Sequence, residues 1–331
     1  MAIQWFPGHM HATRKAIVKR LPDIDVVIEL LDARAPGSSA NPLLAELAGS
    51  KPSLKVLNKQ DLADPARTAL WLAHYQAQPG TNALALDASA SAPARQLIAA
   101  SRTLVPLRGG MVKPVRVLIC GIPNVGKSTL INTPIGTRKA KTGDEPGITK
   151  TEQRIALASD FDLFDTPGLL WPRIVVEQSG YNLAATGGIG RNAYDEEEVA
   201  LALLASVRQP YGDRLQERYK LADFSRLSDD ALLADIARKR GGLLPGGQVN
   251  LQKAAEIVIN DFRSGAWGRI TLETPGEFAL WCEAGLLREA ERQERVAART
   301  RKKPPQRGGE ATDTGSVTGM PEPGDEGSSN A

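Results

Sequence analysis

The sequence predicts an α/β fold with a mostly parallel sheet, followed by a smaller all-α domain and a disordered C-terminal tail. Short apolar runs alternate with helix-length stretches over residues 23–168, which is typical of a parallel sheet with helices on both faces. After Trp171 the apolar residues recur at helical spacing. From residue 303 the chain is rich in Pro, Gly, Ser and charge, so it buries too little apolar surface to offset its ordering entropy.

The apolar, β-branched runs of the first part are the expected strands. In chain order they are Val26–Leu31, Leu54–Leu57, Ala83–Leu86, Val115–Cys120 and Phe161–Phe164. An edge strand is expected over residues 152–158. Stretches such as Ala66–Ala77 and Ala94–Leu104 lie between the strands and supply the helical connections that parallel strands need.

Start and stop signals mark a helix in the second part. Ser228 precedes two aspartates, and Gly241 follows a basic last turn, which predicts a helix over residues 227–240. Helical apolar spacing predicts three further helices, over residues 196–207, 251–262 and about 275–301. Because no clear strand pattern follows Trp171, the second domain is expected to be all-helical.

The composition excludes several classes of protein. An apolar content of 42% supports a packed core, and 331 residues suggest about two domains. No run approaches the ~18 apolar residues of a membrane span, and basic residues interrupt any N-terminal signal core. Cys120 and Cys282 make neither a disulfide framework nor a zinc cage. We therefore expect a cytoplasmic protein with reduced thiols and no membrane partner.

The charge is unevenly placed, although the net charge is only +3. Residues 1–20 hold basic side chains and no acidic one, and a second basic cluster precedes the acidic part of the tail. The N-terminal basic residues are Arg14, Lys15, Lys19 and Arg20. Such segments can neutralise phosphates, and they can equally be solvated chain ends.

Residues 121–128 read GIPNVGKS, a complete GxxxxGK[ST] phosphate-binding loop. Its glycines let backbone N–H groups turn toward phosphate oxygens, Lys127 reaches the terminal phosphates, and the Ser128 hydroxyl can ligate Mg²⁺. The loop follows a predicted strand and precedes a predicted helix start, which is the context that this chemistry requires. The sequence therefore predicts a nucleoside triphosphatase.

A second motif indicates which base is bound. Residues 58–61 read NKQD directly after the strand at 54–57. The Asp61 carboxylate can accept hydrogen bonds from N1–H and the amino group of guanine, a donor pair that adenine lacks. The stretch Asp87-Ala88-Ser89, after the strand at 83–86, is a candidate turn whose backbone contacts the same base. The sequence leaves open whether the contacting residues are shifted by one position.

Two further motifs complete a phosphate site. Asp165 opens the DTPG motif at residues 165–168; this carboxylate can hold Mg²⁺ through water, and the Gly168 N–H can contact the γ-phosphate. Thr149, in PGIT at 146–149, lies between the two phosphate motifs. Its hydroxyl is the expected second protein ligand to Mg²⁺.

The base motifs precede the phosphate motifs in this chain, whereas in ordinary GTPases they follow. The same strands still complete the sheet, so the order indicates a circularly permuted P-loop GTPase domain, a topology that is simple when termini lie close together at the surface. The DTPG loop leads directly into the helical domain, so a nucleotide-dependent switch there can act on whatever that domain binds.

Together these motifs resemble the circularly permuted GTPases, specifically the ribosome biogenesis GTPase A family. The matching stretches are WFPGHM at 5–10, DAR at 32–34 with Pro36, NKQD at 58–61, GIPNVGKS at 121–128, PGITK at 146–150, DTPGLL at 165–170, DFR at 261–263 and GRI at 268–270. The resemblance covers about residues 1–275. It implies Mg²⁺-dependent GTP hydrolysis coupled to late assembly of the large ribosomal subunit, with the subunit precursor and its rRNA as partners of a monomer.

Motifs and resemblance together imply four domains and a set of site residues. The domains are a basic N-terminal segment (1–22), a circularly permuted G domain (23–178), a helical RNA-binding domain (179–302) and the tail (303–331). The catalytic candidates are His9 and Lys127, and the Mg²⁺ ligands are Ser128, Thr149 and Asp165. The expected GTP-binding residues are Asn58, Lys59, Asp61, Ala88, Ser89, Asn124, Val125, Gly126, Lys127, Ser128, Thr129, Thr149 and Gly168.

Three positions differ from ordinary GTPases or from the family pattern, or indicate an additional ion. Leu169 follows DTPG where Ras-like proteins carry a water-positioning glutamine; an apolar side chain cannot orient water, so the motif histidine, His9, is the favoured replacement, although it can instead pack or contact RNA. Asn124 resembles the asparagine that ligates K⁺ in potassium-stimulated relatives. Pro134 departs from the family pattern and should end the helix after the P-loop early.

Two other functional classes stay open from sequence. One is a non-catalytic, GTP-dependent RNA-binding module, in which the nucleotide only sets affinity. The other is an ATP-using P-loop enzyme such as a kinase, against which Asp61 argues. The candidate RNA contacts are the N-terminal basic residues and Arg238-Lys239-Arg240, although the latter can also be a solvated helix end. The acidic cluster at 195–198 repels phosphate locally.

Overall fold

The structure is a computed structural model that describes residues 3–89, 93–108, 113–132 and 153–302, without the side chains of His9 and residues 299–302. The chain divides into one compact unit that reaches to Glu289 and a second that begins at Ala290. The predicted G domain and most of the predicted helical domain lie in the first unit. The domain boundary after residue 178 stays a prediction.

A six-stranded sheet with the order β3-β2-β1-β4-β6-β5 forms the centre of the first unit. Its strands are β1 (Val26–Asp32), β2 (Ser53–Asn58), β3 (Thr81–Ala85), β4 (Val115–Gly121), β5 (Gln153–Ala158) and β6 (Phe161–Asp165). Neighbouring strands are parallel except β5, which runs antiparallel to β6 at the edge. The expected mostly parallel sheet and its edge strand are confirmed.

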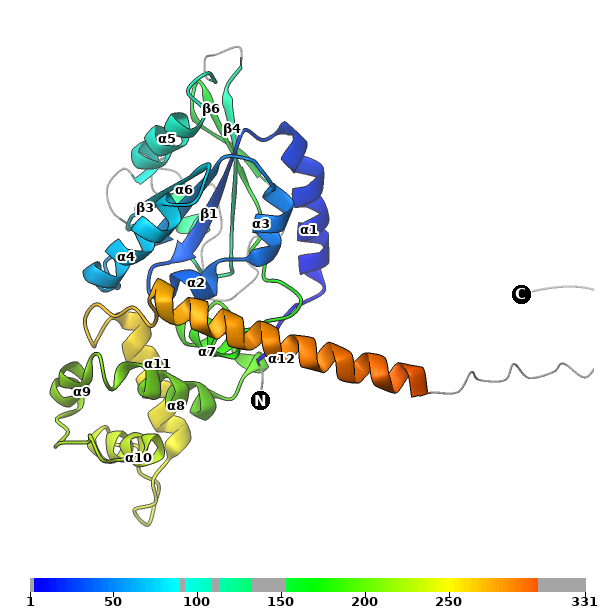
Figure 1. The fold of residues 1–331 in the computed structure, drawn as a ribbon. Coiled ribbons are helices and arrows are strands. Elements are labelled where there is room, and N and C mark those ends of the chain that lie inside the picture. The colour runs from blue at the N-terminus through cyan, green and yellow to red at the C-terminus, as the bar shows by residue number, and fades with distance from the viewer. Residues whose placement is uncertain (1–2, 90–92, 109–112, 133–152, 303–331) are drawn as a thin grey trace, which may run out of the picture. The chain divides into compact units, whose positions relative to one another are not determined.

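Helices cover both faces of this sheet (Figure 1). On one face lie α1 (His9–Arg20) and α3 (Pro42–Ala48), and on the other α5 (Pro93–Leu104) and α6 (Lys127–Asn132). The short α2 (Pro36–Ser39) follows β1, and α4 (Pro65–Gln76) packs on β3. Strand β1 is buried along its whole length, which explains why its sequence is mostly apolar.

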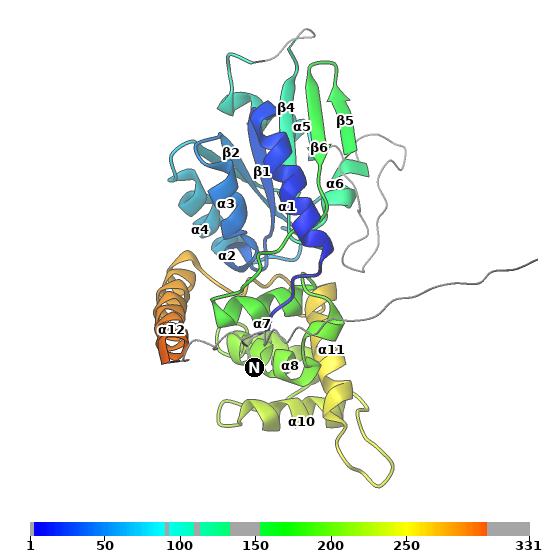
Figure 2. The same cartoon turned by 90° about the vertical axis from the view of Figure 1, so that its right-hand side faces the viewer.

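The chain after Trp171 is helical, as expected. It forms α7 (Glu177–Thr186), α8 (Glu196–Val207), α9 (Gly212–Tyr219), α10 (Asp229–Lys239), α11 (Leu251–Ser264) and α12 (Pro275–Lys302). Ser228 caps α10, because its hydroxyl accepts a hydrogen bond from the Ala231 N–H at 3.2 Å. Helices α7, α8 and α11 lie beyond the end of the sheet where β1 leads into α2 (Figure 2). The sequence signals did not identify α7 and α9.

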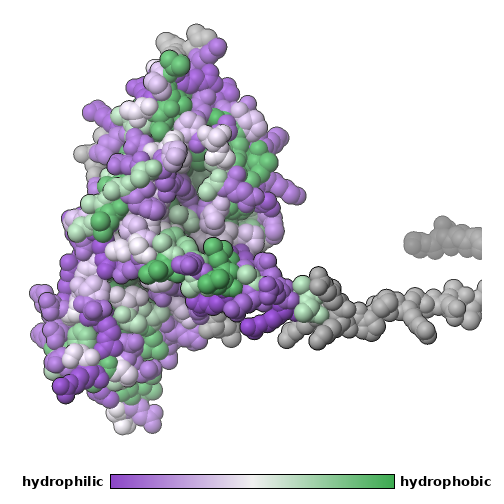
Figure 3. Space-filling model, viewed as in Figure 1, coloured by the Kyte–Doolittle hydropathy of each residue, from purple (hydrophilic) through white to green (hydrophobic). Residues whose placement is uncertain are grey.

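The first part of α12 carries an exposed apolar surface. Leu280, Leu286 and Leu287 are all more than half exposed, and apolar side chains gather over this helix on the face shown in Figure 3. Among the helices that the structure describes, none is long and apolar enough to cross a membrane.

A buried carboxylate ties α2 to α7 just before α12 begins. Glu273 is fully buried, and its oxygens accept hydrogen bonds from the Ser38 N–H (2.7 Å), the Ser38 hydroxyl and the Asn182 amide (2.9 Å). Burial raises the pKa of Glu273 above its ordinary value, and the hydrogen bonds oppose this only in part. The folded protein therefore holds a proton that the unfolded chain releases more readily.

This raised pKa makes stability depend on pH. As the pH rises above the ordinary pKa of a glutamate, the unfolded chain loses its proton first, so the wild-type protein is expected to lose stability relative to a Glu273→Gln variant. The loss levels off once the pH exceeds the pKa of Glu273 in the folded state. Denaturant titrations of both proteins across this range measure the difference. A wild-type advantage that grows with pH would contradict the raised pKa.

Candidate nucleotide-binding site

The predicted motifs meet at one edge of the sheet. Each motif begins at the last residue of a strand: NKQD at Asn58 of β2, the P-loop at Gly121 of β4, and DTPG at Asp165 of β6. These three strands are parallel to β1 and to one another, so their carboxyl ends lie at the same edge. In open α/β sheets this edge is where ligands bind.

The P-loop has the tight backbone that a phosphate-binding loop needs. Asn124 has a φ of 56° and Gly126 a φ of 101°, both in the left-handed region. A Cβ on Gly126 would lie 2.3 Å from the Asn58 amide nitrogen. Glycine at this position is therefore required both by its φ and by the close approach of the NKQD motif.

Lys127 is buried at the first turn of α6, with 7% of its surface exposed. Its ammonium donates hydrogen bonds to the carbonyls of Gly121 and Ile122, each at 3.0 Å. Burial lowers the pKa of Lys127, and the charge of Asp165 opposes this shift. The Lys127 ammonium is thus bound to carbonyl oxygens of its own loop. The charged oxygens of a phosphate would be stronger hydrogen-bonding partners than these carbonyls.

Asp165 carries a buried carboxylate at the start of the DTPG motif. Its side chain is fully buried, and neither oxygen has a partner among the residues that the structure describes. Burial raises the pKa of Asp165 to about 6, although Lys127 opposes this. Because an unpaired buried carboxylate is costly, these two oxygens fit a divalent cation well.

A site with one carboxylate and few other protein ligands suits Mg²⁺. In the described part of the chain, no three His, Cys, Asp or Glu side chains cluster into a metal cage. Mg²⁺ typically takes one or two carboxylates and completes its shell with water and substrate phosphates. Ser128 follows Lys127 in α6 and is partly buried, and its role as the hydroxyl ligand to Mg²⁺ stays a prediction.

The DTPG loop packs directly on the P-loop. The Leu169 N–H donates a hydrogen bond to the Gly121 carbonyl at 3.1 Å, and a Cβ on Gly168 would lie 2.8 Å from the Cα of Pro123. The Leu169 side chain is itself fully buried. The residue in the place of the Ras glutamine therefore contributes to the core, as its apolar character predicts.

Asn58 joins the base motifs to the P-loop. Its amide nitrogen donates to the Val125 carbonyl at 2.8 Å, and its amide oxygen accepts from the Ala88 N–H at 2.9 Å. Within the turn, Asp87 accepts hydrogen bonds from both the backbone and the hydroxyl of Ser89. The structure thus brings Asn58, Val125 and Ala88 together, with Ser89 in the same turn as Ala88. The Asp61 side chain is exposed, and the contact of these residues with GTP stays a prediction.

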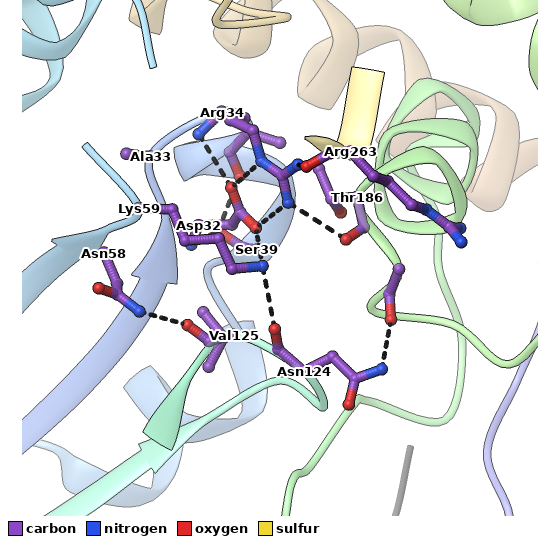
Figure 4. Close-up of polar contacts among 12 residues, drawn as sticks. Asp32, Ala33, Arg34, Ser39, Asn58, Lys59, Asn124, Val125, Thr186 and Arg263 are labelled. Carbon is purple, nitrogen blue, oxygen red and sulfur yellow. Dashed lines mark hydrogen bonds and ion pairs between the residues drawn. The ribbon is translucent and has the colours of Figure 1, made fainter. Parts of the chain in front are cut away.

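Lys59 lies at the centre of a cluster that the sequence did not reveal (Figure 4). Its ammonium donates to Asp32 Oδ2 at 2.9 Å and to the Asn124 carbonyl at 3.0 Å. Arg34 binds both oxygens of Asp32, at 2.9 and 2.7 Å. Sequence reasoning found Asp32 and Arg34 only as part of the DAR motif, without a role. The available signal was the position of two charged residues, Asp32 and Arg34, at and just after the end of a mostly apolar strand.

The N-terminal motif lies along the DTPG loop. Gln4 pairs with Ile174 through two hydrogen bonds of 2.9 Å, and the Met10 sulfur accepts a hydrogen bond from the Leu170 N–H at 3.5 Å. His9 begins α1 immediately before Met10. The backbone of the catalytic candidate is therefore close to the DTPGLL segment, while its side chain lies outside the described residues.

The remaining predicted site residues divide into two groups. Thr129 lies in α6 with Lys127 and Ser128 and is exposed. Thr149 and Pro134 lie outside the described residues, so the second Mg²⁺ ligand and the early end of the helix stay predictions. The described part of α6 ends at Asn132.

Comparisons of the sequence identify relatives with a common function. A family model described as "50S ribosome-binding GTPase" matches residues 116–228. A ribosome biogenesis GTPase A from Bacillus cereus is 42% identical over 84% of this chain and 96% of its own length. A mitochondrial ribosome-associated GTPase 1 from Xenopus tropicalis is 33% identical over 81% of this chain and 94% of its own length.

Solved structures share the fold. The GDP-bound structure of YlqF matches 79% of this chain and 99% of its own length, with a TM-score of 0.58 and 25% identity. GNP-bound YlqF from T. maritima covers 80% of this chain with a TM-score of 0.55 and 24% identity. This similarity extends over both the sheet and the helical part of the chain, and it supports the circularly permuted order that the motifs indicate.

Proposed function

Because the chain belongs to the ribosome biogenesis GTPase A family, we propose that it binds the precursor of the large ribosomal subunit through its rRNA and couples GTP hydrolysis to late assembly. GTP hydrolysis and a ribosome-related role follow from the family itself. The identity of the particle and the stage of assembly are the proposal. The family assignment also excludes the alternative that the P-loop belongs to an ATP-using kinase.

The site residues have complementary roles in this hydrolysis. Asp61 reads the guanine base, and Asn58 holds the base loops to the P-loop through its hydrogen bonds to Val125 and Ala88. Lys127 exchanges its carbonyl partners for phosphate oxygens and stabilises the charge that develops during attack by water. Asp165 is the anchor for Mg²⁺, with the hydroxyls of Ser128 and Thr149. When bound, Mg²⁺ neutralises charge on the phosphate oxygens.

Water at the γ-phosphate needs an orienting group that Leu169 does not supply. His9 is our candidate, because the sulfur of the next residue, Met10, accepts a hydrogen bond from the Leu170 N–H in the DTPGLL segment. The potassium proposal concerns Asn124, whose side-chain nitrogen donates to the Gly187 carbonyl at 3.1 Å. An amide oxygen is the kind of ligand that K⁺ takes, so the side-chain oxygen of Asn124 is the atom that we propose for it.

The observation that carries the proposed coupling is the direct contact between P-loop and helical segment. Asn124 belongs to the P-loop, and Gly187 ends α7, the first helix after the DTPG loop. A change in the P-loop on GTP binding or hydrolysis therefore acts on the helical segment through one hydrogen bond. This arrangement suits a protein whose nucleotide state controls its hold on a partner.

Exposed basic residues are the proposed contacts to rRNA phosphates. Arg14, Lys15 and Lys19 on α1 are exposed, and so are Arg238, Lys239 and Arg240 at the end of α10. Arg20 is engaged with Asp23 and lies over the Phe164 ring, so it is a weaker candidate. We propose that the protein acts as a cytoplasmic monomer, with residues 179–302 as the RNA-binding domain.

Purified large-subunit precursor particles are expected to stimulate GTP turnover by this protein, because a GTPase coupled to assembly should hydrolyse on its particle. Turnover is measured with and without the particles, with mature small subunits as the control. Equal turnover in all three would favour a passive, nucleotide-dependent binding module.

The same assay in NaCl in place of KCl tests the potassium proposal, which equal rates would contradict.

A further inference from the structure

The DAR motif forms a buried ionic cluster at the carboxyl end of β1. Asp32 and Arg34 are each 2% exposed, and the guanidinium of Arg34 grips both oxygens of the Asp32 carboxylate. Burial alone would raise the pKa of Asp32, but Arg34 and Lys59 hold it well below its usual range. Asp32 is therefore charged in the folded protein and shared between two cations.

Both cations of this cluster reach other parts of the chain. Lys59 of the NKQD motif donates to Asp32 and to the Asn124 carbonyl in the P-loop. Arg34 donates to the Thr186 carbonyl at the end of α7, at 3.2 Å, and lies over the Phe262 ring of α11 at 5.1 Å. The cluster thus contacts the base motif, the P-loop and the helical segment at the same time.

The contacts close into a ring, as Figure 4 shows. From Lys59 the path runs through Asp32 and Arg34 to Thr186, continues along the chain to Gly187, and returns through Asn124 to Lys59. Lys59 and Asn124 both have a φ in the left-handed region, 62° and 56°. A non-glycine residue holds such a backbone only when its surroundings compensate the strain, and here the ring contacts supply that compensation.

We propose that Asp32 and Arg34 are positioning residues for nucleotide binding, which hold Lys59 against the P-loop and tie both to the end of α7. Nucleotide at the P-loop then orders residues 184–190, and order in those residues in turn favours nucleotide, because coupling between two sites is reciprocal. Neither residue touches the nucleotide itself. The proposal rests on the assigned nucleotide site, which a Lys127→Ala variant tests separately.

Arg34→Lys is the main test, because it keeps the positive charge and loses the two-pronged grip on Asp32 together with the Thr186 contact. The Kd values of isolated protein for GDP and for a non-hydrolysable GTP analogue are expected to rise on the order of tenfold, the scale on which outer-shell partners act at binding sites. At saturating nucleotide, the amides of residues 184–190 should lose the added protection against hydrogen exchange that the wild type shows. Measurements on isolated protein do not depend on any ribosomal partner.

Arg218→Lys is the matched control. Arg218 makes an equivalent two-pronged ion pair with Asp261, at 2.9 and 2.7 Å, inside the helical segment and away from the nucleotide motifs. It should lower thermal stability without changing either Kd or the nucleotide-dependent protection. A purely structural role for Arg34 would make the two variants alike in all three measurements.

Asn124→Gly provides a second route if Arg34→Lys does not fold. Glycine adopts the φ of 56° without strain, and the variant removes the side-chain hydrogen bond to Gly187. Protection of residues 184–190 should again become independent of nucleotide at saturation. The proposal is overturned if either folded variant keeps the wild-type protection response, or if Arg34→Lys binds both nucleotides within twofold of the wild type.

Discussion

Lys127→Ala should reduce kcat/KM for GTP by roughly 10²–10³, the usual cost of removing one preorganised donor to developing charge. The ammonium is already buried at the mouth of the P-loop, where it donates hydrogen bonds to the Gly121 and Ile122 carbonyls. Its removal also takes away a charge that helps to lower the pKa of Asp165. Steady-state turnover and nucleotide titration measure the two effects separately.

Lys51→Ala is the matched control for that experiment. Lys51 also donates its ammonium to a backbone carbonyl, that of Ile24, at 2.8 Å, but it lies between α3 and β2, away from the predicted motifs. Its variant should turn over GTP at the wild-type rate. If Lys127→Ala folds and keeps wild-type turnover, residues 121–128 are not the site of hydrolysis.

His9→Ala should lower kcat by about 10²–10³ and leave the affinity for GTP almost unchanged, as expected for a group that assists proton transfer or orients water. The structural reason is the position of α1: Met10 contacts Leu170 in the DTPGLL segment, while the fully buried Leu169 cannot reach water. Stimulated turnover on ribosomal particles and GTP binding are the two readouts.

His11→Ala controls for the loss of a histidine from the same helix. His11 is exposed and meets the edge of the Phe6 ring, with a centroid distance of 4.8 Å. Its replacement should leave kcat unchanged. Unaltered stimulated turnover in His9→Ala would remove His9 from the mechanism and leave it a packing or RNA contact. Equal losses in both variants would instead point to a general effect on α1.

Local sequence was sufficient for the elements and for the chemistry of each loop. The strands read as apolar runs because parallel strands are buried on both faces, and Ser228 caps its helix as its residue type predicts. Helix α7 was harder to find. It contains Gly180 and has no side-chain cap, so its formation depends on packing, with Gly180 against Ile3.

The candidate site was predictable wherever one loop carries the function. The P-loop motif needs Gly126 for its φ and Lys127 for its charge, and both needs are local. The contact of Gly126 with Asn58 could not be predicted, because it joins residues 68 positions apart through the order of the strands. The same limit applies to Asp165, since its motif indicates a metal ligand but not that the carboxylate is fully buried.

By itself the sequence determined the chemistry of this protein: a phosphate loop, a guanine motif and a metal-binding aspartate, in an order that indicates circular permutation. Only the tertiary structure decided how these parts are connected. Arg34 lies 152 residues from Thr186, whose carbonyl it contacts, and no local pattern encodes that pairing. The physical reason is that a buried guanidinium needs partners from several segments at once, and those segments meet only when α7 and α11 dock at the carboxyl edge of the sheet.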